Sequence, residues 1–163
     1  MTTKTGQLQV RVTTKQKAAI RRLARRAGQS VSSYVLSRVL PDERVRFGEI
    51  LRSLQEESER SFALAELSDF LTCLGPSEFR DAVGEAEIGA LAPLAANYVA
   101  AMVEQAASRL GVDPPDWTSD VEPLYEPHFA VPFRSLRPHL LRSAPVAFKR
   151  RNIFVDSSAG DRV

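Results

Sequence analysis

The stretch QLQVRVTTKQKAAIRRLARRAGQSVSSYVLSRVL, residues 7–40, decides the fold of the first quarter of the chain. It begins with strict alternation, in which Leu8, Val10 and Val12 share one face and polar residues occupy the other. A hydrophobic period of two residues is typical of a β-strand with one buried face. The sequence therefore predicts one short strand at the start of this stretch.

The residues after this strand change to helical spacing. Thr13 and Thr14 can cap a helix, and Gly28 is expected to end it. Ser30 is the expected N-cap of a second helix, which Pro41 stops. The apolar positions of the two helices recur at helical spacing and are Ile20, Leu23, Ala24, Ala27, Val31, Tyr34, Val35 and Val39.

One short strand and two short helices cannot close a hydrophobic core alone, because a single strand leaves both of its edges unpaired. Pairing with the same strand of a second copy removes one free edge from each chain and joins the two apolar faces. The sequence therefore predicts an obligate homodimer through residues 7–40, held by an intermolecular two-stranded ribbon.

This pattern resembles the ribbon-helix-helix family of DNA-binding proteins, which includes Arc-type repressors and many bacterial antitoxins. The resemblance rests on the alternating strand QLQVRV, the basic first helix and the turn GQSVSSYV. The predicted fold class is mostly α with one short N-terminal β-strand. A ribbon-helix-helix head (residues 1–41) is followed by a helical body (42–110) and by a segment rich in proline and aromatic residues that ends in an extended tail (111–163).

The resemblance implies which residues contact double-stranded DNA. Outward side chains of a β-ribbon enter the major groove, where glutamine can pair with adenine and arginine with guanine. The base-reading residues are therefore Gln7, Gln9 and Arg11. The start of the second helix can bind phosphate through its free N–H groups. The predicted phosphate-binding residues are Lys4, Thr13, Gln29, Ser30, Ser32 and Ser33.

The distribution of charge agrees with a nucleic-acid-binding head. The whole chain has a net charge of only +2, yet nine basic residues and no acidic residue precede Asp42. The remaining residues carry a net charge of −7. Such asymmetry indicates a head that binds a polyanion and a body that does not. A basic helix that is merely solvated is the alternative. The basic residues of the head are Lys4, Arg11, Lys15, Lys17, Arg21, Arg22, Arg25, Arg26 and Arg38.

The segment from Gly111 onward is expected to contact a groove of this chain or of a partner. Prolines exclude long regular structure between residues 111 and 132, but the aromatic residues there are too apolar for a free linker. The tail is similar to the C-terminal ends of bacterial antitoxin-like proteins that are paired with nucleotidyltransferase-type toxins, which implies a cognate toxin as partner. The predicted partner-binding residues are Trp117, Tyr125, Phe129, Phe148, Lys149, Arg150, Arg151 and Phe154.

The remaining residues offer little for catalysis. His128 and His139 do not form a metal-ligand pattern with Cys73, and no phosphate-binding loop or nucleophile elbow is present. Cys73 lies in the apolar run FLTCL and is expected to be a buried structural thiol. We therefore expect no enzyme activity, no metal and no cofactor. The polar start of the chain lacks the apolar core of a signal peptide, which predicts a cytoplasmic protein.

The leading hypothesis from the sequence is a sequence-specific transcriptional repressor that acts as the antitoxin of a type II toxin–antitoxin pair. In that hypothesis the head represses its own operon and the C-terminal part neutralises the toxin. Three alternatives remain open. One is an accessory DNA-binding protein of plasmid mobilisation or partition, and another is a protein-interaction module whose head only dimerises. The remotest is an enzyme in the helical body.

Overall fold

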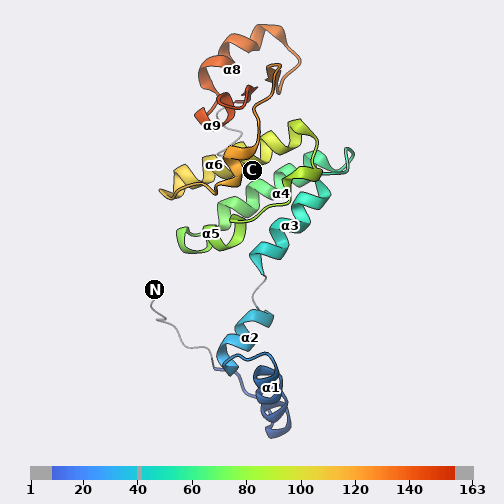
Figure 1. Ribbon diagram of the computed structural model, residues 1–163, viewed down its shortest axis with the longest axis vertical. Coiled ribbons are helices and arrows are strands. Elements are labelled where there is room, and N and C mark those ends of the chain that lie inside the picture. Colours follow the sequence, from blue (N-terminus) through green and yellow to red (C-terminus); the bar gives the residue numbers. More distant parts are fainter. Residues whose placement is uncertain (1–8, 40–41, 157–163) are drawn as a thin grey trace. The chain divides into compact units, whose positions relative to one another are not determined.

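The computed structural model describes residues 9–39 and 42–156 of the chain (Figure 1). The chain divides into two compact units, Met1–Asp42 and Glu43–Val163. The described residues are mostly helical, as the sequence predicts.

The first unit contains two helices, α1 (Thr14–Arg26) and α2 (Val31–Val39), which pack against each other around the buried side chain of Ala24. Residues 9–12 form no strand in this single chain, and Val10 and Val12 are exposed. A ribbon between two chains requires the second copy, so the ribbon and the homodimer stay predictions.

The second unit begins with three helices that form one side of its core: α3 (Glu43–Ser53), α4 (Arg60–Cys73) and α5 (Pro76–Val83). The rings of Phe47 and Phe70 stack with their centroids 5.9 Å apart and join α3 to α4. Glu78 accepts a hydrogen bond from the backbone N–H of Gly75 at the start of α5. A short 3-10 helix, η1 (Ile88–Ala90), then leads to the longest helix.

The helix α6 (Pro93–Leu110) is the centre of the second unit (Figure 1). It contacts α4 and α5, and it also contacts the C-terminal helix α9 (Val146–Lys149). Alanine dominates its buried positions, and the short side chains allow neighbouring helices to approach closely. Gly111 ends α6 with a φ of +66°, a left-handed conformation that glycine adopts without strain.

The C-terminal part folds back onto α6. It contains α7 (Trp117–Asp120), the strands β1 (His128–Phe129) and β2 (Ile153–Phe154), the 3-10 helix η2 (Arg134–Leu136), and α8 (Arg137–Ser143). The two strands are parallel, with His128 opposite Ile153. This part of the tail is folded onto the second unit rather than extended, because Phe148, Ile153 and Val155 form a second hydrophobic cluster with Ala101 of α6. Residues 157–163 lie outside the described residues.

The environment of Cys73 also differs from the prediction. Its thiol is free and exposed at the last position of α4. The neighbouring residues Leu71 and Leu74 are buried, so the apolar run does contribute to the core. The helical turn directs Cys73 away from them, and hydropathy alone does not resolve which position of a run faces outward.

Candidate nucleic-acid interface

The start of α1 is fixed by a capping box. The backbone N–H of Gln16 donates to Oγ1 of Thr13 at 3.3 Å, and Oε1 of Gln16 accepts from the backbone N–H of Thr13 at 2.9 Å. These bonds satisfy two donors that a helix start leaves free. They confirm the predicted cap. Thr13 is a predicted phosphate-binding residue, and its hydroxyl is already occupied within the chain.

The turn between the two helices has a defined geometry. Gly28 adopts a φ of +65°, and its N–H donates to the carbonyl of Arg25. The N–H of Gln29 donates to the carbonyl of Ala24 at 3.0 Å. This pair of bonds is the Schellman ending of a helix, which glycine favours because it has no Cβ. Gly28 therefore ends α1 as the sequence predicts.

The hydroxyl of Ser30 caps α2. Its Oγ accepts a hydrogen bond from the backbone N–H of Ser33 at 3.1 Å, which confirms the predicted N-cap. The helix has no acidic residue in its first turn. The first N–H groups of a helix have no carbonyl partner within it, so those of Val31 and Ser32 remain available to an anion. Gln29, Ser30, Ser32 and Ser33 are all exposed around them.

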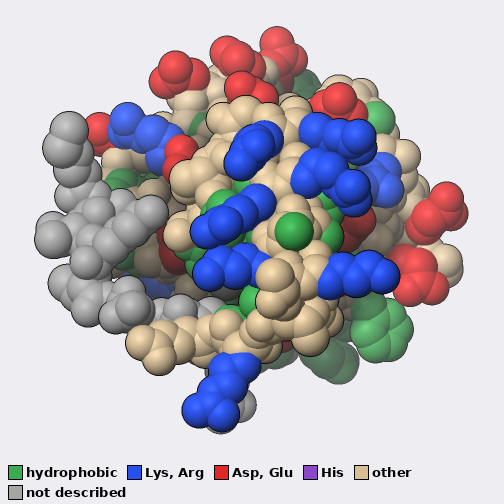
Figure 2. All heavy atoms as spheres, turned by 90° about the horizontal axis from the view of Figure 1, so that it is seen from below, with side chains coloured by type: hydrophobic (Ala, Val, Ile, Leu, Met, Phe, Trp, Pro, Cys, Tyr) green, Lys and Arg blue, Asp and Glu red, His purple; other side chains and the backbone are tan. Residues whose placement is uncertain are grey.

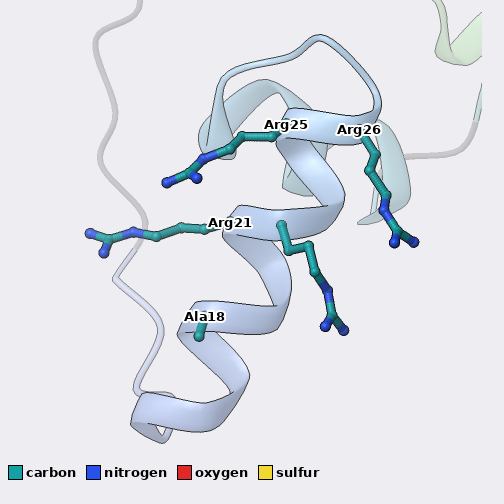
Figure 3. Close-up of a pocket in the computed structure, with 5 residues that line it drawn as sticks. Ala18, Arg21, Arg25 and Arg26 are labelled. Carbon is teal, nitrogen blue, oxygen red and sulfur yellow. The ribbon is translucent and has the colours of Figure 1, made fainter.

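Four arginines cover the exposed side of α1. Arg21 and Arg25 point to one side of the helix, and Arg26 points to the other (Figure 3). Together with Arg22 they surround a surface pocket whose floor includes Ala18. The pocket is a gap between long exposed side chains rather than a cleft in the fold. Figure 2 shows Lys and Arg side chains gathered on the face in view.

Like charges repel across this helix. Two arginines four positions apart in a helix destabilise it by about 0.3 kcal/mol. None of the four arginines forms an ion pair within the described residues. A bound polyanion offsets this repulsion. These four side chains project to different sides of α1 and form its basic surface, the arginine face, which can attract the phosphates of a nucleic acid.

The predicted base-reading residues are only partly described. Gln9 and Arg11 are exposed, whereas Gln7 and the predicted phosphate-binding residue Lys4 lie outside the described residues. Arg11 lines an apolar groove beside Val10 and Val12. The walls of this groove come from both helices and include Ile20, Val31 and Val35. The groove thus contains Val10 and Val12 of the predicted apolar face, but the charged residues Arg11, Lys17 and Arg21 line it as well.

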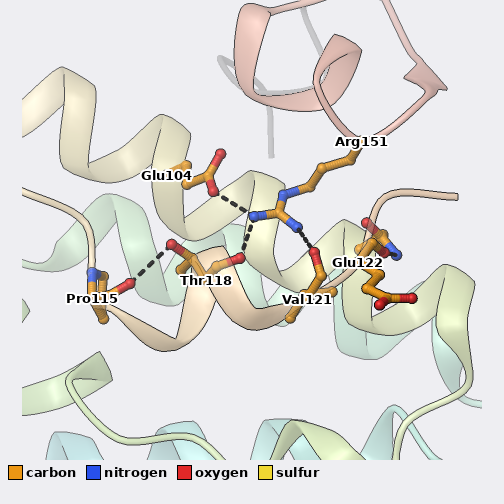
Figure 4. Close-up of polar contacts among 7 residues, drawn as sticks. Glu104, Pro115, Thr118, Val121, Glu122 and Arg151 are labelled. Carbon is orange, nitrogen blue, oxygen red and sulfur yellow. Dashed lines mark hydrogen bonds and ion pairs between the residues drawn. The ribbon is translucent and has the colours of Figure 1, made fainter.

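All the predicted partner-binding residues lie in the second unit, and several of them make contacts within it. The indole N–H of Trp117 donates to the carbonyl of Val83 at 2.8 Å. Phe148 is buried in the cluster on α6. Arg151 is buried as well, and its guanidinium is bound to Glu104 and to the carbonyls of Thr118 and Val121 (Figure 4).

The other predicted partner-binding residues reach the surface to different degrees. Tyr125 and Arg150 are exposed, and Lys149 donates from Nζ to the carbonyl of Arg142 at 2.9 Å. Phe129 stacks on Phe154 with a centroid distance of 5.0 Å. The structure thus brings Phe129 and Phe154 together at the strand pair.

Sequence reasoning missed the role of Glu104. Its carboxylate pairs with Arg151, but it occurs as a single acid in an alanine-rich helix with no motif around it. The sequence signal that could have indicated it is weak, because a charged residue in an apolar helix suggests only that some partner exists.

The described residues also bear on metal binding and on membrane insertion. No group of three or more His, Cys, Asp or Glu side chains is arranged to hold a metal ion in the described part of the chain. None of the described helices is both long and apolar enough to cross a bilayer.

Comparison with known proteins bears on the N-terminal part. Residues 2–56 match the family model NikA-like, which is described as mobilization protein NikA. This match supports a DNA-binding family of the ribbon-helix-helix type for the region that contains the arginine face and the apolar groove. It agrees with the mobilisation alternative better than with the antitoxin hypothesis. No curated protein and no solved structure matches the chain.

Proposed function

We propose that this protein is an accessory DNA-binding protein of plasmid mobilisation, which binds duplex DNA as a homodimer through its N-terminal unit. The observation that carries the proposal is the match of residues 2–56 to the mobilization-protein family, in a region that has nine basic residues and no acidic one before Asp42. The proposal assigns the protein to the cytoplasm, where plasmid DNA is processed.

The open apolar groove supports the homodimer. In the single chain Val10 is 66% exposed, and Val12, Leu23, Val31 and Leu36 are exposed too. Leaving several apolar side chains in water is unfavourable by roughly 25 cal/mol per Å² of surface that could be buried. The same groove of a second copy offers a matching apolar surface, and strand pairing by residues 7–12 would cover both grooves.

The exposed polar groups around the groove supply the DNA contacts in this proposal. Arg11, with Gln7 and Gln9, reads bases in the major groove from the paired strands. The free N–H groups at the start of α2 and the neighbouring Gln29, Ser30, Ser32 and Ser33 bind phosphate. The arginine face of α1 adds a contact that does not depend on sequence, or else it binds the acidic surface of a neighbouring protein.

Toxin neutralisation has less support than mobilisation. Phe148 and Arg151 were expected to grip a toxin, yet both are buried in contacts within the second unit. No match names a toxin or an antitoxin. We also propose that the protein is not an enzyme, since its sequence holds neither a phosphate-binding loop nor a nucleophile elbow.

The test is footprinting of the purified protein on plasmid DNA that carries an origin of transfer and a relaxase gene, and on the promoter of its own gene. We expect protection of a short inverted repeat near the origin of transfer, and copurification with the plasmid's relaxase. Protection of the protein's own promoter alone, together with rescue of cells from the product of an adjacent toxin gene, would establish the antitoxin function instead. Absence of salt-dependent DNA binding would leave only a dimerisation module.

A further inference from the structure

A second basic surface lies in the C-terminal lobe, defined as residues 127–155. This lobe contains six Arg or Lys residues and no acidic residue, although the body before it is strongly acidic. It comprises β1, η2, α8, α9 and β2, at the top of the second unit in Figure 1. The acid-free stretch belongs to one folded region, separate in sequence from the basic helix α1. Asp156, directly after this stretch, pairs with His139 of α8 at 3.2 Å.

Hydrogen bonds and ion pairs within the described residues involve the charged groups of only two of the six cations. Arg151 is buried against Glu104, and the ammonium of Lys149 binds the carbonyl of Arg142 at the end of α8. The other four cations are Arg134, Arg137, Arg142 and Arg150. All four are exposed, and none of them forms an ion pair within the described residues. Their charges are therefore available to an anionic ligand.

Aromatic rings are interleaved with these cations. The guanidinium of Arg137 lies over the ring of Phe129, 4.6 Å from its centroid, and Phe129 in turn stacks on Phe154. Phe133 is 65% exposed, next to Arg134 in the chain. Tyr125, just before the lobe, is 97% exposed, and its carbonyl accepts a hydrogen bond from Asn152 beside Arg150 and Arg151.

We propose that the C-terminal lobe is a second nucleic-acid site that binds single-stranded DNA, separate from the duplex-binding surface of the N-terminal unit. Exposed arginines attract the phosphates, and the rings of Tyr125 and Phe133 stack on bases. Bases of a duplex are already stacked on one another and do not offer their faces to such rings. The exposed aromatic rings therefore favour a single strand as the ligand. A duplex-binding surface would need only the arginines, which contact phosphates.

The test measures the affinity of the full chain for a labelled single-stranded oligothymidylate and for a labelled duplex of the same length, by fluorescence anisotropy at low salt. Changing Tyr125→Ala together with Phe133→Ala is expected to weaken oligothymidylate binding by roughly 10-fold or more. Duplex binding is expected to stay unchanged. Because both rings are exposed, these changes leave the fold intact, which a thermal melt verifies.

Phe62→Ala is the matched control, since Phe62 is a 76% exposed aromatic residue on α4 outside the lobe. It is expected to leave both affinities unchanged. A second variant, Arg134→Gln with Arg142→Gln, is expected to lower oligothymidylate affinity and its salt dependence, whereas the control Arg80→Gln changes neither.

Three results overturn the proposal: no oligothymidylate binding by the unaltered chain, unchanged binding in both lobe variants, or loss of that binding when the four arginines of α1 are replaced. Unchanged binding in both lobe variants would indicate instead that the lobe binds an acidic protein partner, with the exposed Leu136, Leu141 and Val146 as apolar contacts. Duplex binding is measured on the same preparations, so failure of this proposal is distinguished from failure of the N-terminal function.

Discussion

Arg151 forms an ion pair with Glu104, which lies 47 positions earlier in the chain. The side chains of the two residues are only 5% and 17% exposed. The guanidinium also binds the carbonyls of Thr118 and Val121, so one side chain joins α9 and its following turn to α6 and to the α7 segment (Figure 4). The C-terminal lobe is thereby fixed to the body by a buried charge.

Replacing one member of this pair leaves the other charge buried without its partner. Arg151→Met is therefore expected to destabilise the protein by about 3–5 kcal/mol, because an unpaired buried charge is costly. Denaturation by urea measures the change. Arg150→Met is the matched control, since Arg150 is the exposed neighbour of Arg151. If the control lowered the free energy of unfolding by more than about 0.5 kcal/mol, the destabilisation could not be assigned to the buried ion pair.

Arg11 is expected to determine sequence preference. Arg11→Ala should weaken binding to the cognate duplex by about 1–3 kcal/mol and narrow the difference between cognate and random duplex, because alanine cannot form the bidentate hydrogen bonds to guanine. Competition binding with both duplexes measures this. Arg52→Ala is the control, because Arg52 is an exposed arginine on α3. If the Arg11 variant selected the cognate duplex as strongly as the unaltered protein, the strand residues would not read bases.

The arginines of α1 are expected to act through charge alone. Replacing Arg21, Arg22, Arg25 and Arg26 by glutamine should weaken binding to cognate and random duplexes by the same factor. The slope of log affinity against log salt should decrease by roughly 1 for each phosphate that is no longer neutralised. Titrations at several salt concentrations measure the slope. An unchanged slope would assign the arginine face to an acidic protein rather than to DNA.

The apolar groove is expected to be the dimer interface. Val10→Asp places a charge in the groove, so the dimer should dissociate and duplex binding should be lost. The second unit should stay folded, because its core does not include Val10. Analytical ultracentrifugation measures the oligomeric state. Val45→Asp, at an exposed valine on α3, is the control, and a stable dimer of the Val10 variant would exclude this groove as the interface.

Burial lowers the pKa of His128 below its ordinary value of about 6.5. As the pH falls through that value, the imidazole of His128 takes up a proton more readily in the unfolded chain than in the folded chain. The contribution of His128 to folding stability is therefore present above about pH 6.5 and is lost below it. His128→Gln should flatten this part of the stability–pH curve measured by urea denaturation. Equal slopes for the variant and the unaltered protein would show that His128 is not responsible.

The sequence predicted the local structure of the N-terminal unit well, because that structure is set by short-range chemistry. Thr13, Gly28 and Ser30 form hydrogen bonds or backbone conformations that depend on residues within five positions of them. The ribbon stays a prediction, since the expected partner of the strand lies in a second copy of the chain.

The C-terminal part was predicted less well, because its contacts are long-range. Nothing near Arg151 indicates that Glu104 lies beside it, and the basic run around Lys149 has the composition of an exposed tail. Phe148 and Ile153 are buried only because they pack against α6. The alanines of α6 do not indicate from the sequence which face of that helix these residues cover. Tyr125 and Phe133 show the converse, since the structure leaves these apolar rings in solvent.

The burial of Ile153 and Val155 against α6 has a consequence for synthesis on the ribosome. The last part of the core cannot form until these residues have emerged, whereas residues 7–40 emerge far earlier, at a rate of about 5–20 residues per second. The proposed homodimer could therefore form between the first units of two nascent chains on one messenger RNA while the second face of α6 is still uncovered. Assembly of the dimer would then precede completion of either subunit, which favours pairing between chains made from the same message.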